Sequence, residues 1–128
     1  MSKKIISTSK APAAVGPYSQ AVAANGFVFI SGQLGLDAAT GKFVEGGVEA
    51  QAERALDNME AILKEAGLGF EDVIKTTVLL ASMDDFKVVN AVYASRFPLN
   101  PPARAAFAVK TLPLNGLVEI EAIALATS

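Results

Sequence analysis

The clearest periodic pattern in the chain is helical and covers residues 48–66, where apolar residues recur every three or four positions. Charged residues fill the opposite face, and Gly67 follows where a left-handed residue commonly ends a helix. A second helix is predicted for residues 84–97. Its apolar face carries Phe86, Val89, Tyr93 and Phe97. The pattern therefore predicts two amphipathic helices.

Segments rich in β-branched and apolar residues predict six strands. One opens residues 1–15, which continue as a proline- and alanine-rich loop, and the others cover residues 18–24, 27–31, 73–80, 103–109 and 117–126. Between the second and third strands, Asn25-Gly26 indicates a tight hairpin, because both residues tolerate positive φ. The run 27–30 is apolar at every position, which predicts a central strand buried on both faces.

The order of elements is β-β-β-α-β-α-β-β, with a turn and short hairpin expected for residues 35–46. This order predicts an α/β fold of the α+β kind: a single domain spanning residues 1–128, with two helices packed on one face of a mixed sheet. In the last strand, Glu119 and Glu121 share a face with Ile123 and Leu125. Water-exposed faces seldom carry such an apolar pair, so we expect that face to meet another subunit. The 23 alanines and the mean hydropathy of +0.38 favour the same interpretation.

Composition excludes several kinds of chemistry. Without cysteine or histidine, the chain cannot use a thiolate nucleophile or serine–histidine catalysis, and it lacks the usual ligands of zinc, haem and iron–sulfur sites. The formal charge of −2 and the pI near 5.1 argue against a nucleic-acid partner. No apolar run is long enough to cross a membrane, and the first residues do not resemble a signal peptide. We therefore expect a cytoplasmic protein with no membrane partner.

Arg104 stands apart from the other two arginines, which fall on the predicted helices. It opens an otherwise uncharged strand of small and apolar residues. A buried guanidinium needs a carboxylate partner, from the protein or from a ligand. Within the protein, Glu119 and Glu121 are the acidic residues that lie inside a predicted strand. Two alternatives stay open: a structural salt bridge to one of these glutamates, or a site that binds a carboxylate ligand.

Three further features are weaker candidates for a site. Tyr18 places an aromatic hydroxyl at the start of a strand, and Ser31-Gly32 ends the third strand, where a glycine lets a backbone N–H approach a bound group. Asn90 lies one position from the apolar stripe of the second helix. Each also has an ordinary structural explanation: a packing anchor, a bulge or strand end, and a solvent-facing helix residue.

Seven short segments occur in the order and at the spacing of a known family. They are residues 11–20, 31–33, 55–59, 75–78, 89–90 with Tyr93, 102–104 and 118–123. Through them the chain resembles the RidA/YjgF family of small enamine/imine deaminases along essentially its whole length. The resemblance implies a chorismate-mutase-like fold, a homotrimer with clefts between subunits, and hydrolysis of 2-imino acids such as 2-iminopropanoate and 2-iminobutanoate to 2-oxo acids and ammonia. It also implies a functional link to the pyridoxal-phosphate-dependent dehydratases that release these imines.

The resemblance assigns roles to single residues. It implies that Arg104 binds the substrate carboxylate, that Glu119 orients the attacking water, and that Tyr18 belongs to the catalytic cleft. It further implies substrate-binding positions at Ser31, Gly32, Asn90 and Ala106. Many members of the family have cysteine where this chain has Ala106, so here only the backbone N–H of that residue remains to bind a substrate. Neither a metal nor an organic cofactor is implied.

Two other classes of function are compatible with the sequence. One is a non-catalytic trimeric regulator that binds small carboxylates. The other is a chaperone-like or RNA-acting protein, and the acidic pI counts against RNA. A carboxylate-binding regulator has no need of Glu119, so the presence of this residue favours the enzyme.

Overall fold

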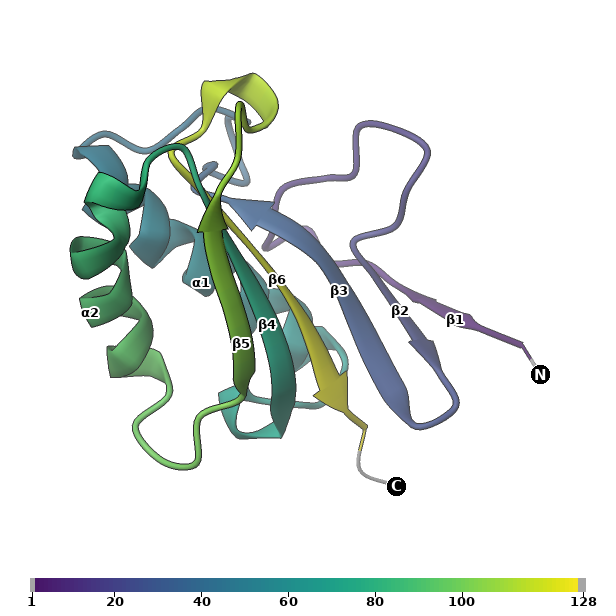
Figure 1. The fold of residues 1–128 in the computed structure, drawn as a ribbon. Coiled ribbons are helices and arrows are strands. Elements are labelled where there is room, and N and C mark those ends of the chain that lie inside the picture. Colours follow the sequence, from purple (N-terminus) through teal and green to yellow (C-terminus); the bar gives the residue numbers. More distant parts are fainter. Residues whose placement is uncertain (1, 127–128) are drawn as a thin grey trace.

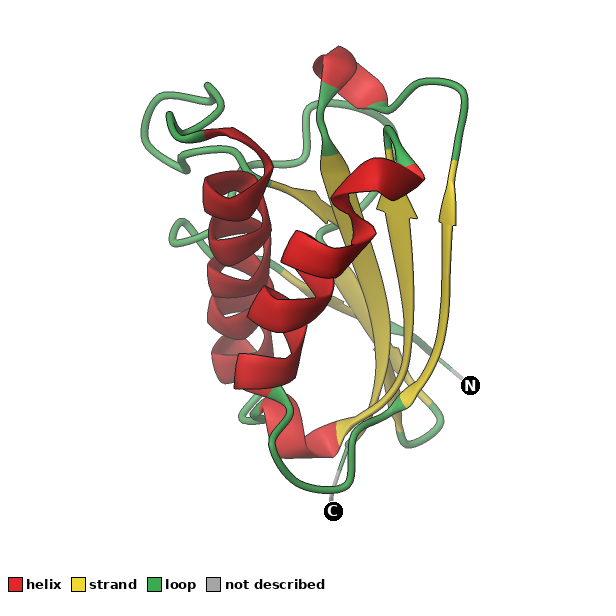
Figure 2. Ribbon diagram, turned by 60° about the vertical axis from the view of Figure 1, so that its left-hand side comes forward, coloured by secondary structure: helices red, strands yellow, loops and turns green. Residues whose placement is uncertain are grey.

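The computed structural model describes residues 2–126, and a six-stranded β-sheet forms its centre. Two α-helices pack against one face of the sheet (Figures 1 and 2). In chain order the elements are β1 (Lys4–Ile6), β2 (Ala21–Ala24), β3 (Phe27–Leu34), α1 (Gly47–Glu65), β4 (Val73–Leu80), α2 (Phe86–Arg96), β5 (Ala103–Ala108) and β6 (Val118–Leu125). The α+β class, with both helices on one face of a mixed sheet, is confirmed.

The strand order is β1-β2-β3-β6-β4-β5, so the last strand of the chain lies inside the sheet. Neighbouring strands are antiparallel except β4 and β5, which are parallel and are connected through α2. Strand β5 forms one edge of the sheet (Figure 1). As a result, Glu119 on β6 has a strand on each side, whereas Arg104 on β5 has a strand on one side only.

Both predicted helices form close to their expected bounds. The apolar stripe of α1 is buried between Ala52 and Leu63 and half-buried at its two ends, and Gly67 follows the helix with φ of +79°, as predicted. The second helix begins as a 3₁₀ turn (Met83–Asp85) and continues as α2, because the Ser82 hydroxyl accepts the N–H of Asp84 and starts the turn early. No helix in residues 2–126 is both long and apolar enough to cross a membrane.

The predicted hairpin between β2 and β3 is present, with φ of 55° at Asn25 and 86° at Gly26. Strand β3 is not buried on both faces, however. Phe29 points away from the helices and keeps 46% of its surface exposed, so this prediction is wrong for the single chain. The reason is that both helices cover the same face, and nothing in residues 2–126 covers the other.

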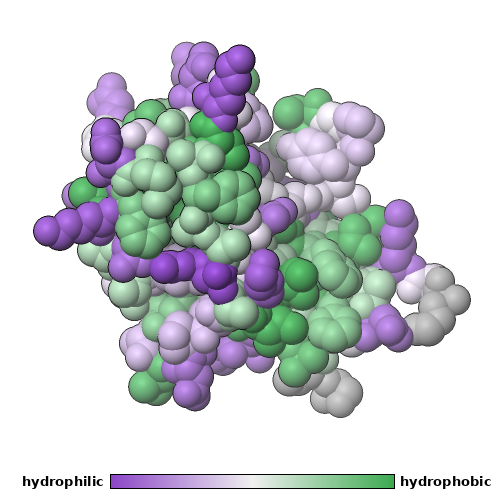
Figure 3. All heavy atoms as spheres, in the orientation of Figure 1, coloured by the Kyte–Doolittle hydropathy of each residue, from purple (hydrophilic) through white to green (hydrophobic). Residues whose placement is uncertain are grey.

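The face opposite the helices, hereafter the open face, is partly apolar. Phe107 of β5 and Leu125 of β6 are 47% and 45% exposed there, close to the value for Phe29 of β3. Figure 3 views this face and shows apolar side chains gathered over the end of the sheet where β3 begins and β6 ends. The open face is the one that the pattern of the last strand predicts to meet another subunit.

Two buried amide side chains tie α1 to the sheet. Asn58 donates through Nδ2 to the carbonyls of Leu34 and Leu36, each at 3.0 Å. The Oε1 of Gln51 accepts the N–H of Leu117 at 2.9 Å, immediately before β6. Because buried polar groups need partners, these bonds fix the end of β3 and the start of β6 against the helix.

Gly35→Ala should destabilise the fold, because Gly35 lies against the backbone of α1. A Cβ at this position would be 2.5 Å from the Cα of Gln51 and 2.7 Å from its carbonyl oxygen, which can move only with the helix. We expect a loss of about 1–3 kcal/mol in the free energy of unfolding, measured with urea. Gly16→Ala is the control, since its Cβ would make an ordinary 3.6 Å contact with Tyr18. Equal losses in both variants would contradict the steric explanation.

Candidate active site

Arg104 lies on the edge strand β5 and is held by one face of α2. Its Nη1 donates to the Oδ1 of Asn90 at 2.7 Å. Its Cζ lies 4.9 Å from the ring centroid of Tyr93 and 5.5 Å from that of Phe86. The three contact residues follow one another at steps of four and three along the helix, so they share one face. The guanidinium is thus oriented by three contacts while Arg104 stays exposed.

The alternative of a structural salt bridge to Glu119 or Glu121 is wrong. The ion pairs within residues 2–126 belong to the other two arginines, and none involves Arg104. The strand register gives the reason. Arg104 pairs with Thr76 of β4, which faces the helices, whereas Glu119 pairs with Leu79. Because side chains alternate along a strand, Arg104 and both glutamates lie on opposite faces of the sheet.

Glu119 lies on the open face beside a β-bulge in β3. The register between β3 and β6 shifts between Ile30 and Gln33, so Ser31 and Gly32 form the bulge. The Glu119 carboxylate lies directly against Gly32, and a Cβ at position 32 would overlap it. Glycine is therefore required at this position for Glu119 to keep its place.

The surroundings of Glu119 make its carboxylate more basic than usual. Partial burial raises the pKa of Glu119 above its ordinary value of 4.5, and the negative charge of Glu121 raises this pKa further. Glu121 is two residues away on the same strand and therefore on the same face. A carboxylate with a raised pKa is better suited to accept a proton from water.

Tyr18 lies on the loop before β2 and is half exposed. The Ser31 hydroxyl donates to the Ser19 carbonyl at 2.6 Å, which anchors this loop beside the bulge. The buried Gln20 holds the preceding part of the loop. Its side chain accepts the N–H of Thr8 and donates to the carbonyls of Thr8, Ala11 and Pro12.

Ala106 lies two residues after Arg104 on the same, helix-facing side of β5, opposite Val78 of β4. It is half-buried and packs against the core. The structure therefore divides the predicted site residues into two groups. The edge cluster comprises Arg104, Asn90 and Ala106, and the bulge cluster comprises Tyr18, Ser31, Gly32 and Glu119.

Sequence reasoning missed three residues that hold these groups in place. Phe86 and Tyr93 belong to the predicted apolar stripe, yet they also contact a cation. Phe86 and Tyr93 lie four residues before and three residues after Asn90, so all three share a helix face. This spacing is the sequence feature that could have placed both rings beside Arg104. Gln20 had no predicted role. A polar glutamine just before an apolar strand is the sequence feature that could have pointed to Gln20. The pattern alone does not show which carbonyls its side chain would bond.

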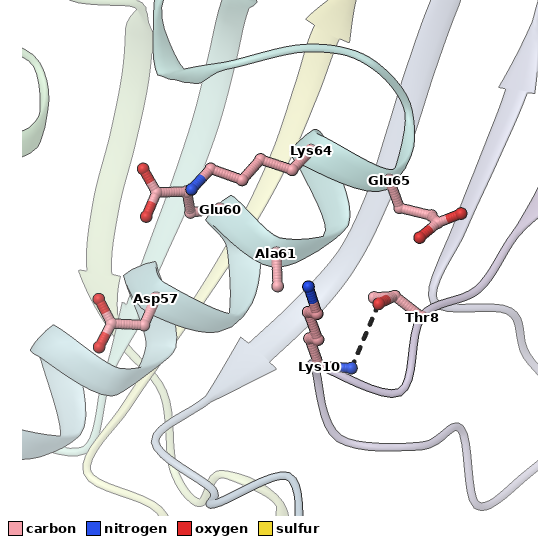
Figure 4. Close-up of a pocket in the computed structure, with 7 residues that line it drawn as sticks. All are labelled: Thr8, Lys10, Asp57, Glu60, Ala61, Lys64 and Glu65. Carbon is pink, nitrogen blue, oxygen red and sulfur yellow. Dashed lines mark hydrogen bonds between the residues drawn. The ribbon is translucent and has the colours of Figure 1, made fainter.

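Two cavities lie elsewhere on the described chain. One of about 310 Å³ separates α1 from the N-terminal loop, and none of its lining residues is buried: Thr8, Lys10, Asp57, Glu60, Ala61, Lys64 and Glu65 (Figure 4). The other, of about 200 Å³, lies on the open face beside Glu121. Neither is lined by Arg104 or Glu119, so neither is the candidate site. No group of acidic side chains in residues 2–126 has the arrangement of a metal site.

Comparison with known proteins identifies the family. Residues 8–126 match the family described as endoribonuclease L-PSP. The chain belongs to this family. The matched segment includes all residues of the edge and bulge clusters.

Several members of the family are close relatives. Over 122 residues, 95% of this chain, it is 57% identical to the 2-iminobutanoate/2-iminopropanoate deaminase of Bos taurus, of which the match covers 89%. It is 55% identical to the chloroplastic Reactive Intermediate Deaminase A of Arabidopsis thaliana and spans 65% of that protein's length. The crystal structure of E. coli TdcF with bound serine is 40% identical, with a TM-score of 0.92 over 97% of this chain and 99% of that one. The predicted resemblance is confirmed.

Glu121→Gln should lower the pKa of Glu119. The amide removes the repelling charge but leaves the burial, so this pKa should fall and yet stay above its ordinary value. Titration of the Glu119 carboxyl carbon by NMR measures the change. Glu71→Gln, at an exposed residue of the 3₁₀ turn Phe70–Asp72, is the control and should have no effect. An unchanged pKa in Glu121→Gln would show that Glu121 does not influence Glu119.

Proposed function

We propose that the protein hydrolyses reactive 2-imino acids, such as 2-iminobutanoate and 2-iminopropanoate, to 2-oxo acids and ammonia. The observation that carries this proposal is the guanidinium of Arg104. It is seated on two aromatic rings and an amide oxygen, and no carboxylate in residues 2–126 neutralises it. Such a group is suited to bind a ligand carboxylate through two parallel hydrogen bonds.

The relatives support this choice of substrate. Two of them are named for deamination of 2-imino acids or of reactive intermediates. Serine, which is bound in the structure of TdcF, carries a carboxylate next to a carbon that bears nitrogen, as a 2-imino acid does.

In the proposed reaction, Arg104 holds the carboxylate while Glu119 holds a water molecule against the imine carbon. The water oxygen adds to this carbon, Glu119 takes the proton released, and the C=N electron pair moves to the protonated imine nitrogen. Glu119 then passes its proton to that nitrogen. The C–N bond then breaks and its electron pair leaves with ammonia, while the new hydroxyl forms the C=O bond of the 2-oxo acid and returns its proton to the Glu119 carboxylate, from which water takes it. Positioning and general base catalysis together account for the rate gain.

One copy of the chain cannot bring both the Arg104 guanidinium and the Glu119 carboxylate to one substrate. The carboxylate carbon and the imine carbon are directly bonded, whereas Arg104 and Glu119 lie on opposite faces of the sheet. Their partners on β4, Thr76 and Leu79, are also three residues apart, which is about 10 Å along a strand. The edge cluster of one copy must therefore meet the bulge cluster of another.

We further propose that this meeting takes place in a homotrimer. A head-to-tail contact between two different surfaces closes into a ring when the rotation permits, and three copies would form three equivalent clefts. Each cleft would take Arg104, Asn90 and Ala106 from one subunit and Tyr18, Ser31, Gly32 and Glu119 from the next. Covering the open face would also bury its exposed phenylalanines and leucine.

Two other functions are less well supported. A non-catalytic regulator that binds carboxylates would use the edge cluster alone, and it would not need a carboxylate with a raised pKa against Gly32. The family description mentions an endoribonuclease. The net charge of −2 opposes binding to an RNA backbone, because phosphate contacts need a basic surface.

The cellular setting follows from the substrate. We propose that the imines come from pyridoxal-phosphate-dependent dehydratases and that the protein acts where these enzymes release them. A cytoplasmic location stays a prediction, and one relative is a chloroplast protein.

Arg104→Lys should lower kcat/KM by about 10- to 100-fold, because a lysine cannot make the bidentate contact. The assay follows how much the protein speeds release of the 2-oxo acid by threonine dehydratase. Arg54→Lys is the control, since Arg54 pairs with Asp37 on the surface, and it should keep full activity. Both variants should melt near the wild-type temperature. Full activity in Arg104→Lys would refute the proposed carboxylate site.

Mixed oligomers of two inactive variants should recover activity if each cleft combines two subunits. Arg104→Ala and Glu119→Gln should each lose most activity when pure, the second by about 10²–10⁴-fold because it removes the base. After co-refolding in equal amounts, about a quarter of the clefts should contain both intact residues. Native mass spectrometry confirms the mixing. Mixed trimers without recovered activity would show that the cleft does not form in this way.

A further inference from the structure

Tyr93 contacts both the cation of Arg104 and a buried hydroxyl in the sheet. Its Oη is hydrogen-bonded to the Oγ1 of Thr76 at 2.6 Å, and the two residues are only 5% and 1% exposed. A buried hydroxyl is costly without a partner, so this bond holds the ring in place. The ring of Phe97 packs against it with 4.7 Å between centroids.

Thr76 is also the register partner of Arg104 on the neighbouring strand. The ring of Tyr93 thus spans two strands: its hydroxyl end binds β4, and its face lies 4.9 Å from the guanidinium carbon that projects from β5. Burial raises the pKa of Tyr93 above its ordinary value of 10.0, so the phenol stays neutral beside the cation at physiological pH.

We propose that Tyr93, fixed by Thr76, is a positioning residue that sets the plane of the Arg104 guanidinium for the substrate carboxylate. This inference rests on the proposed function, in which Arg104 binds that carboxylate. A free arginine side chain samples many rotamers, and freezing them on binding lowers affinity. A bidentate contact also requires the guanidinium plane to match the carboxylate plane. A fixed ring under the guanidinium reduces the rotamer freedom that Arg104 loses on binding. It also holds the guanidinium plane in the orientation that matches the carboxylate plane.

Loss of the Tyr93 ring should weaken substrate binding more than it lowers turnover. A cation–π contact corresponds to a change in an equilibrium constant of about 2-fold for an exposed cation and about 30-fold for a desolvated one. The carboxylate is held equally in the ground state and in the transition state, so weaker positioning raises KM and leaves kcat nearly unchanged. A general loss of folded protein would instead lower the apparent kcat.

The first experiment removes the ring. Tyr93→Leu should raise KM, and the Kd of the stable product 2-oxobutanoate measured by calorimetry, by several-fold up to about 30-fold. The control is Phe70→Leu, because the Phe70 ring lies 5.9 Å from the guanidinium carbon of Arg96, outside the site. It removes a comparable ring from a cation and should leave KM unchanged. Equal increases in KM for both variants would overturn the proposal.

The second experiment separates positioning from stability. Tyr93→Phe leaves the Thr76 hydroxyl buried without its partner and should lower the melting temperature. Adding Thr76→Val removes both polar groups and should restore the melting temperature, while KM stays raised because the ring is no longer pinned. A purely structural role for the bond predicts that KM recovers together with stability, and that result would overturn the role of Thr76.

The same measurements distinguish this proposal from the proposed function. If the wild-type protein does not hydrolyse imino acids but binds 2-oxobutanoate, and Tyr93→Leu weakens this binding, the deaminase activity is refuted and the positioning role stands. If the wild type is active and Tyr93→Leu keeps its KM and Kd, the positioning role is refuted and the activity stands. A wild-type protein with neither activity nor binding would overturn both.

Discussion

Alternation of side chains along paired strands determines where chemistry is possible in this protein. On β4, Thr76 faces the helices and Leu79 faces away, and the strands on either side follow the same register. Arg104 is therefore confined to the helix-covered face and Glu119 to the open face. The sheet itself separates the Arg104 guanidinium from the Glu119 carboxylate, and for this reason the proposed function places the substrate between two copies of the chain.

The three arginines have different surroundings: two form ion pairs, and Arg104 forms none within residues 2–126. Arg96 contacts Glu53 at 2.7 Å and Asp57 at 2.9 Å, and Arg54 reaches Asp37 at 3.2 Å. These pairs brace α1 against α2 and against the loop after β3. Arg104 is held by an amide oxygen and ring faces instead, which orient a guanidinium without neutralising its charge. It therefore keeps its capacity to bind a carboxylate.

Buried amides give the bulge cluster its rigid support. Asn58 and Gln51 on α1 bond backbone groups at the end of β3 and the start of β6, the two strands that place Gly32 and Glu119. Gln20 does the same for the loop that carries Tyr18. Each amide would be costly to bury without these bonds, so the same groups that stabilise the fold also hold the site in position.

Local patterns in the sequence were enough to predict both helices, the Asn25-Gly26 hairpin and the α+β class, because periodicity and turn chemistry act over a few residues. They also singled out Arg104 and Glu119 as unusual charges in strands. They could not show that β6 inserts between β3 and β4, nor the register that places these two residues on opposite faces, nor that Tyr93 contacts Arg104. Strand order and register depend on pairing between distant segments. Such pairing follows from how the whole core packs, and only the tertiary structure reveals it.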